Sequence, residues 1–177
     1  MLYSFQQFKP KLGSGVFLAE GCKIIGDVTI GSQSSIWFNT VIRGDLAPIY
    51  IGDRSNIQDL SVIHVNKDQP VVIEEEVSVG HSVVLHGCTI RKGSLIGMGA
   101  IVLNGSEIGE ETLVAAGSLI PENKSFPPRV LLMGSPAKII RELTYEDLSK
   151  MRRTVANYVI KAEEYISHSP IDKDHFV

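Results

Sequence analysis

The sequence predicts an all-β fold, a parallel β-helix of six-residue repeats that is followed by one C-terminal α-helix. Three observations predict this fold. Large aliphatic residues recur every six positions through the first two thirds of the 177-residue chain. Glycine often follows them directly, as at Gly31, Gly52 and Gly97. Beyond residue 143, apolar residues recur instead at spacings of three and four, which is the period of an amphipathic helix.

The six-residue period predicts the coils of the β-helix, each coil being one turn of the chain. A helix would need spacings of three and four, and a single strand would need strict alternation, so neither explains the period. Short strands joined by turns do explain it, because each strand then places one large aliphatic side chain inside. The eighteen aliphatic positions, with three changes of phase, are Leu12, Leu18, Ile24, Ile30, Ile36, Ile42, Ile51, Ile57, Ile63, Ile73, Val79, Leu85, Ile90, Ile96, Val102, Ile108, Val114 and Ile120.

These patterns divide the chain into four parts, in the order β-helix, connecting segment, α-helix and tail. The connecting segment is proline-rich and is expected to be irregular. Thr144, followed three residues later by Asp147, resembles a capping box and predicts the start of the helix. We expect the helix to pack on a flank of the coils and the tail to fray. The predicted boundaries are 1–122 for the β-helix, 123–143 for the connecting segment, 144–167 for the helix and 168–177 for the tail.

Composition excludes several classes of partner. The net charge is −3, whereas nucleic-acid binding needs clustered positive charge. The chain has no apolar run of about 18–20 residues, which a membrane span requires, and its start does not resemble a signal peptide. Two cysteines, Cys22 and Cys88, give no disulfide framework and fit a reducing compartment. We expect a cytoplasmic protein that acts on a small molecule, with no nucleic-acid or membrane partner.

The repeat predicts which polar residues lie together. Three hexads make one triangular coil, so the hexads that begin at residues 42, 63 and 85 stack in successive coils. The aliphatic residue that begins each hexad is its anchor. The residue after each anchor projects from the same edge, and stacked strands lie about 4.8 Å apart. That spacing lets two histidines on this edge share one metal ion. The residues that directly follow the three anchors are Arg43, His64 and His86.

His81 is predicted to lie at a different edge. It comes two places after Val79, and Asp59 should stack one coil away from it. The chain between His81 and His86 spans about 15 Å if extended, so one chain cannot easily bring all three histidines to one ion. Two copies can, if an edge of one meets a different edge of the next, as in a trimer. Three imidazoles with an open position are the ligand set of catalytic zinc.

The alternative is that these are ordinary histidines on a polar surface. The stacking of His64 on His86 favours the metal site, with His81 on the adjoining face beside Asp59. His168 and His175 lie in the tail and are interpreted as ordinary surface histidines.

Several motifs resemble the γ-class carbonic anhydrase family. They are IRGD (42–45), IGDRSNIQD (51–59), VIHV (62–65) and VGHSVVLHGCTI (79–90), and the resemblance extends into the helix through ANYV (156–159). The resemblance implies a left-handed β-helix and a homotrimer with a metal at each interface. The metal would be zinc, with iron or cobalt as alternatives. One subunit would supply His64 and His86, and the adjacent subunit would supply His81.

The resemblance also implies roles for six further residues. Arg43 and Asp45 match a motif that forms ion pairs across the interface, and Asp59 is the expected partner of Arg43. Such a pair would fix register more than it would add stability.

Gln58 matches a glutamine that orients the metal-bound water. Asn56 matches an asparagine that positions carbon dioxide or that glutamine. Tyr158 matches a tyrosine near the metal, or is a core residue of the helix.

The implied activity is that of a zinc-dependent lyase, in which metal-bound hydroxide attacks carbon dioxide and gives bicarbonate. Two departures predict slow turnover, because each cycle must release a proton to solvent. The loop VNKDQPVV (65–72) is short and lacks a glutamate, and Leu46 replaces the glutamate that follows the RxD motif. Asp68 could substitute as the proton carrier, although nothing in the spacing supports it.

Two other functions remain open. A hexapeptide-repeat acyltransferase would use acetyl-CoA and one histidine as a general base, and GSPAK (134–138) is close to a segment of such enzymes. The third function is a metal-binding scaffold with little turnover.

Overall fold

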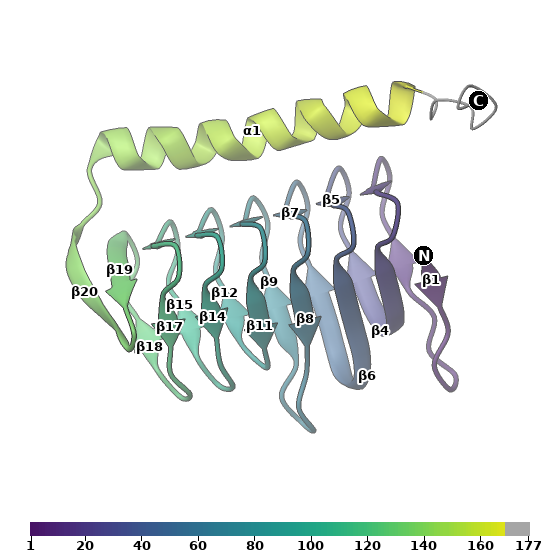
Figure 1. Cartoon of the computed structure of the whole chain (residues 1–177), viewed down its shortest axis with the longest axis horizontal. Helices are drawn as coiled ribbons and strands as arrows, with labels where there is room; N and C mark the ends of the chain where they lie inside the picture. The colour runs from purple at the N-terminus through teal and green to yellow at the C-terminus, as the bar shows by residue number, and fades with distance from the viewer. Residues whose placement is uncertain (169–177) are drawn as a thin grey trace, which may run out of the picture.

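The computed structural model describes residues 1–168 and contains a parallel β-helix with one long helix lying along it. Figure 1 shows the coils side by side along the length of the molecule, with helix α1 running parallel to their axis. This is the fold class that the six-residue period predicts. Residues 169–177, which include most of the predicted tail and His175, lie outside the described residues.

The strands form three faces of a prism. Face 1 is an eight-stranded sheet, and faces 2 and 3 belong to a second sheet whose long strands β4 (Lys23–Ile30) and β6 (Val41–Ile51) bend from one face to the other. Face 1 comprises β3 (Phe17–Leu18), β5 (Ser35–Ile36), β7 (Asn56–Ile57), β10 (Ser78–Val79), β13 (Leu95–Ile96), β16 (Leu113–Val114), β19 (Val130–Gly134) and β20 (Ala137–Glu142).

Faces 2 and 3 begin with β1 (Leu2–Tyr3) and β2 (Lys11–Leu12), which pair with the two halves of β4. Face 2 continues with residues 41–43 of β6, then β8 (Val62–His64), β11 (Val84–His86), β14 (Ile101–Val102) and β17 (Leu119–Ile120). Face 3 continues with residues 49–51 of β6, then β9 (Val71–Ile73), β12 (Thr89–Ile90), β15 (Glu107–Ile108) and β18 (Ser125–Phe126).

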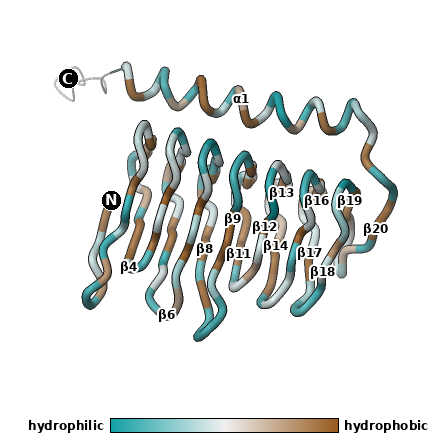
Figure 2. Tube along the Cα trace, turned by 180° about the vertical axis from the view of Figure 1, so that it is seen from behind, coloured by the Kyte–Doolittle hydropathy of each residue, from teal (hydrophilic) through white to brown (hydrophobic). Residues whose placement is uncertain are grey.

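The core is the column of aliphatic side chains that the period predicts. From Ile24 to Ile120, each residue in phase is at most 3% exposed. Leu12 is 39% exposed and Leu18 is half-buried, because the first coil has no further coil stacked on its outer side. Figure 2 shows hydrophobic segments alternating with hydrophilic ones along each coil. Burial of this apolar column is the main term that stabilises the stack.

Buried hydroxyl groups hold the corners of neighbouring coils together. Ser61 Oγ donates to the carbonyl of Gly80 (2.9 Å) and accepts from the backbone N–H of Val83 (3.2 Å). These two bonds enclose the turn that carries His81. Because buried backbone groups need partners, Ser61 fixes the position of this turn relative to the preceding coil.

The segment 123–143 differs from the irregular connection that its prolines predict. It contains β18, which continues face 3, and β19, which continues face 1 and forms an antiparallel hairpin with β20. The β-helix therefore extends beyond the predicted boundary at residue 122. Pro127 and Pro128 lie between β18 and β19, at a corner where a missing N–H does not interrupt the strand pairing.

Helix α1 spans Tyr145–Ser167 and covers face 1 of its own chain. The predicted capping box is present, with Thr144 as the N-cap residue and Asp147 at the third helical position. Trp37 stacks edge-on against Tyr158 and Tyr165, with ring centroids 5.3 Å apart in both pairs. The helix therefore covers the part of face 1 that β3, β5, β7 and β10 form. Among residues 1–168, no helix is long and apolar enough to cross a lipid bilayer.

Candidate metal centre

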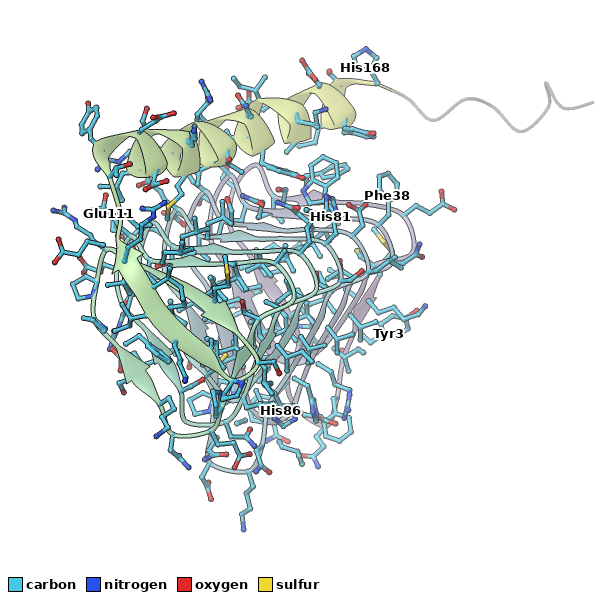
Figure 3. All side chains as sticks on the ribbon, turned by 60° about the vertical axis from the view of Figure 1, so that its left-hand side comes forward. Tyr3, Phe38, His81, His86, Glu111 and His168 are labelled. Carbon is cyan, nitrogen blue, oxygen red and sulfur yellow. The ribbon has the colours of Figure 1, made fainter. Side chains whose placement is uncertain are left out.

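The structure stacks Arg43, His64 and His86 on one edge, as the anchors predict. Arg43 pairs in register with His64, and His64 with His86. We call this edge, where the strands of face 2 end, the two-histidine edge. His81 follows β10 at the opposite border of face 2. In Figure 3, His81 lies on the side of helix α1, whereas His86 lies on the far side of the prism.

Asp45 fixes the tautomer of His64. The Asp45 Oδ1 atom lies 2.9 Å from His64 Nε2, and Arg43 forms an ion pair with the same carboxylate. Partial burial acts to raise the pKa of Asp45, but the hydrogen bonds from His64 and Arg43 outweigh it and lower that pKa. The carboxylate is therefore ionised and can only accept. His64 Nε2 must donate, which leaves the lone pair on Nδ1.

Asn104 and Glu122 fix the tautomer of His86. His86 Nδ1 lies 2.6 Å from Asn104 Oδ1, and Asn104 Nδ2 donates to Glu122 Oε1 (2.8 Å). The amide nitrogen faces the carboxylate, so the amide oxygen faces the imidazole and accepts from it. His86 Nδ1 therefore carries the proton and Nε2 carries the lone pair.

The two remaining ring nitrogens fit a metal ion. His64 Nδ1 and His86 Nε2 lie 3.0 Å apart, so in the neutral rings two lone pairs face each other. A cation between them removes this repulsion. Two nitrogen ligands about 2.0–2.1 Å from one zinc ion are about 3.3–3.4 Å apart at the tetrahedral angle, so a movement of a few tenths of an ångström would bring these two nitrogens to that spacing. Hydrogen bonds from the outer ring nitrogens to protein oxygens are typical of metal-binding histidines.

A single chain supplies only part of a metal site. Among residues 1–168 of one chain, no group of three or more histidine, cysteine or acidic side chains is placed to hold an ion. His64 and His86 are stacked on one edge and His81 lies on another side of the prism, so the three imidazoles do not converge within one chain. A metal ion on the two-histidine edge would need a third ligand from another chain or from solvent.

His81 is oriented outward by Asp59. Its Nδ1 atom lies 2.7 Å from Asp59 Oδ2, and the His81 side chain is 43% exposed. The pairing of Ile57 with Val79 stacks Asp59 below His81, as predicted. Because Asp59 holds Nδ1, the Nε2 atom of His81 is the nitrogen that can reach a ligand outside the chain.

A row of amides leads to a cavity beside His81. Gln58 Nε2 donates to Asn56 Oδ1 (3.0 Å), and Asn56 Nδ2 donates to Ser78 Oγ (2.8 Å). Both amides are buried, so their orientation is fixed. Gln58, His81 and Tyr158 line one cavity between α1 and the coils, whose other walls are mostly apolar. The direct hydrogen bond between the two amides supports the expectation that Asn56 positions Gln58.

Tyr158 is half-buried on α1, and its place near a metal stays a prediction. Its ring packs on Trp37, and it lines the same cavity as His81. Burial raises the pKa of its phenol, and the charge of Asp59 raises it further. The phenol therefore stays protonated near neutral pH and is available as a donor at the cavity wall.

The predicted pair between Arg43 and Asp59 is not formed within one chain. Arg43 pairs with Asp45, and Asp59 pairs with His81. Arg43 is 44% exposed, so it remains accessible to a neighbouring subunit. The cross-interface ion pair stays a prediction.

Two residues of the centre, Asn104 and Glu122, were not predicted. Each stands two places after an aliphatic anchor, Val102 or Ile120, and these anchors stack in register above Leu85. The index of the two-histidine edge, one place after each anchor, gives Leu103 and Pro121 on these coils and therefore does not identify them. Their residue types alone carry no signal for a metal site.

The comparisons with known proteins place the chain in a class and then in a family. Residues 9–44 match the model of the bacterial transferase hexapeptide (six repeats), so this is a hexapeptide-repeat β-helix protein. The chain is 48% identical over 165 residues to a carbonic anhydrase of Geobacillus kaustophilus, covering 93% of this chain and 91% of that relative. It is 46% identical to a probable carbonic anhydrase of Methanocaldococcus jannaschii, covering 89% and 99%. The chain belongs to the γ-class carbonic anhydrase-like family.

A solved structure with a different description is equally similar. A crystal structure from Bacillus cereus, described as a putative acetyltransferase, is 50% identical and superposes with a TM-score of 0.93, covering 94% of this chain and 97% of that one. The fold is therefore shared between relatives that carry either description.

Proposed function

We propose that this protein is a trimeric, metal-dependent carbonic anhydrase that interconverts carbon dioxide and bicarbonate. Zinc is the proposed metal, with iron or cobalt as alternatives. The observation that carries the proposal is the pair of ring nitrogens on His64 and His86, which face each other at 3.0 Å while Asp45 and Asn104 hold the outer nitrogens. The carbonic anhydrases among the relatives support the same activity.

An uncovered apolar face supports association of the subunits. The outward side chains of face 2 form one aliphatic ladder in register, with Val62 and Ile101 about two fifths exposed. Face 1 is covered by α1 over β3, β5, β7 and β10, and face 3 presents mainly polar or mixed side chains. Exposed apolar patches of this kind mark interfaces. The ladder consists of Val41, Val62, Val84, Ile101 and Leu119, and the corresponding row of face 3 of Tyr50, Val72, Thr89, Glu107 and Ser125.

The positions of these residues along the β-helix axis fit a trimer whose three-fold axis runs parallel to that axis. The chain rises about 4.8 Å per coil, and His81 precedes His86 by five residues, about a quarter of a coil. A neighbour at the same height would therefore bring its His81 between the levels of His64 and His86. By the same count, its Asp59 would come between Arg43 and His64. The expected ion pair and the expected ligand set thus require one and the same arrangement.

The protein side chains would orient the reacting groups. When bound, zinc held by three imidazoles supplies a hydroxide nucleophile near neutral pH. Gln58 keeps a fixed amide at the cavity, because Asn56 holds its nitrogen, and its oxygen can accept a hydrogen bond from water. The mostly apolar walls suit an uncharged substrate such as carbon dioxide.

Proton release is expected to limit turnover. Leu46, which is 56% exposed, offers no titratable group, and the loop at 65–72 has no glutamate. External buffer must then accept the proton that each hydration cycle produces. The hydration rate should therefore rise with buffer concentration until another step becomes limiting.

The test combines metal analysis, mass and activity of the purified protein. We expect one zinc per chain, a mass of three chains, and carbon dioxide hydration that a chelator abolishes and zinc restores. A metal-replete trimer without hydration above the buffer rate would contradict the proposed activity. A metal-free single chain would contradict the site itself.

An acetyl-CoA-dependent acyltransferase is the second candidate, favoured by the description of the Bacillus cereus relative. GSPAK lies in the hairpin between β19 and β20. A general base needs a histidine with a free nitrogen, whereas a three-imidazole metal site uses all three. One bound zinc per chain therefore argues against this function. A zinc-loaded trimer that is silent in both assays would be the metal-binding scaffold.

Substitution of Gln58 tests the orienting role. The Gln58→Ala variant should keep one zinc per chain, because Gln58 contacts none of the three histidines, but should lose about 10²-fold in kcat/KM through misplacement of the reacting water. Stopped-flow hydration and metal analysis measure the two effects. Gln69→Ala, in the loop after His64, is the control and should retain full activity. An unchanged rate in zinc-loaded Gln58→Ala would remove Gln58 from the mechanism.

A further inference from the structure

We propose that Asn104, held by Glu122, is a positioning residue of the metal centre that sets the tautomer and the direction of His86. The inference rests on the proposed function, since it concerns the ligands of the same metal. It adds to the site Asn104 and Glu122, which lie on the two coils that follow the coil of His86. It also assigns the exposed carboxylate of Glu122 a role in metal affinity.

The stacking of the coils brings these residues together. Leu85 pairs with Val102, and Val102 with Ile120, so the two-histidine edge continues upward through Asn104 to Glu122. The backbone is tied at the same point, because the N–H of Gly105 donates to the carbonyl of Gly87 (2.7 Å). Gly87 has a φ of +55°, which turns the chain sharply after His86. Asn104 is therefore held at a fixed height above the imidazole.

The direction of each hydrogen bond follows from Glu122. An amide can present either its oxygen or its nitrogen to a neighbour, but an ionised carboxylate only accepts. Glu122 Oε1 takes the bond from Asn104 Nδ2 at 2.8 Å, which turns the amide oxygen toward His86 Nδ1 at 2.6 Å. The reversed amide would donate to Nδ1 and shift the proton to Nε2, the nitrogen that faces His64. A protonated Nε2 cannot ligate a metal.

His86 depends on this arrangement more than His64 does. The partner of His64 is the carboxylate of Asp45, which accepts whichever way it is turned. The partner of His86 is an amide, whose useful orientation must be imposed from outside. Glu122 imposes it, and without Glu122 the amide is free to reverse.

The test compares variants that keep or remove each acceptor, using the full-length trimer. Asn104→Leu has a similar volume but no acceptor, and its zinc affinity in chelator competition should fall by about 10- to 100-fold. Asn104→Asp combined with Glu122→Gln retains an oxygen toward His86 without placing two carboxylates together, and should bind zinc within a few-fold of wild type. Asn66→Leu is the matched control, because the Asn66 amide contacts Gln69 and no histidine.

A second pair of variants changes only the exposed end of the row. Glu122→Leu should weaken zinc binding less than Asn104→Leu does, and Glu122→Gln should fall between Glu122→Leu and wild type, because a glutamine amide can accept from Asn104 but can equally donate to it. Glu122 is exposed, so neither change threatens the fold. Nitrogen-15 NMR of the metal-free protein should report His86 with its proton on Nδ1 in wild type. In Asn104→Leu it should report a mixture of the two neutral tautomers, one with the proton on Nδ1 and one with it on Nε2.

The outcomes separate this inference from the proposed function. If wild type binds zinc and Asn104→Leu binds it equally well with an unchanged His86 tautomer, the inference is wrong and the metal centre stands. If wild type binds no zinc, the proposed function fails. The tautomer of His86 in the metal-free variants then decides the role of Asn104 alone.

Discussion

Replacing His81 with alanine is expected to empty every metal site and to reduce carbon dioxide hydration to the buffer rate. His81 lies on an exposed turn at the border of face 2 and contributes nothing to the apolar core. The coils should therefore stay folded, and the loss should be confined to the metal centre. With only His64 and His86 left, the ion keeps two protein ligands, fewer than the three of catalytic zinc sites. Metal analysis and stopped-flow hydration measure the effect.

Mixing two inactive variants gives the sharper form of this prediction. His81→Ala keeps the two-histidine edge, whereas His64→Ala with His86→Ala keeps His81. After unfolding and refolding together, each mixed trimer should contain one complete interface, so about one third of its sites regain zinc and activity. Each variant refolded alone is the control and should stay empty. Recovery in neither metal nor activity would show that the ligands do not come from different subunits.

Replacing Val62 with aspartate is expected to dissociate the trimer into single chains. Val62 lies between Val41 and Val84 in the aliphatic ladder of face 2. In a closed interface the new carboxylate would be buried without a partner, at a cost on the order of 3–5 kcal/mol in each of the three interfaces. Light scattering or sedimentation measures the mass, and the metal content should fall together with it.

The matched control is Val72→Asp, the same change on face 3. Val72 also points outward from a short strand, and it is the less exposed of the two valines in a single chain. If only the fold of the single chain mattered, Val72→Asp would do more harm. Association through face 2 predicts the reverse order. A stable trimer of Val62→Asp would show that the subunits meet through another surface.

The core could be predicted because one large side chain per strand must point inward, and this rule leaves a period in the sequence. Every aliphatic residue in phase between Ile24 and Ile120 is buried. The same rule gave the stacking of Arg43, His64 and His86, which the strand register confirms. Prolines misled the assignment of 123–143, since composition does not reveal whether a proline falls inside a strand or at a corner.

The partners of the histidines were harder to predict. Asp45 was expected only as a member of an interface ion pair, whereas it also holds His64. Asn104 acts through the orientation of its amide, which depends on Glu122 one coil further on. Such a chain of orientations depends on side-chain geometry across three coils. Residue type and spacing identify the ligands but not the groups that direct them.

The two borders of face 2 carry different members of the proposed ligand set, and this has a consequence for the proposed trimer. A pair of subunits that meet border to border would complete one centre and leave two halves unused. Only a closed ring uses every ligand, so the number of working centres should fall faster than the number of associated chains. On dilution below the dissociation range of the ring, the specific activity should collapse, and protein concentration would then act as a switch on catalysis.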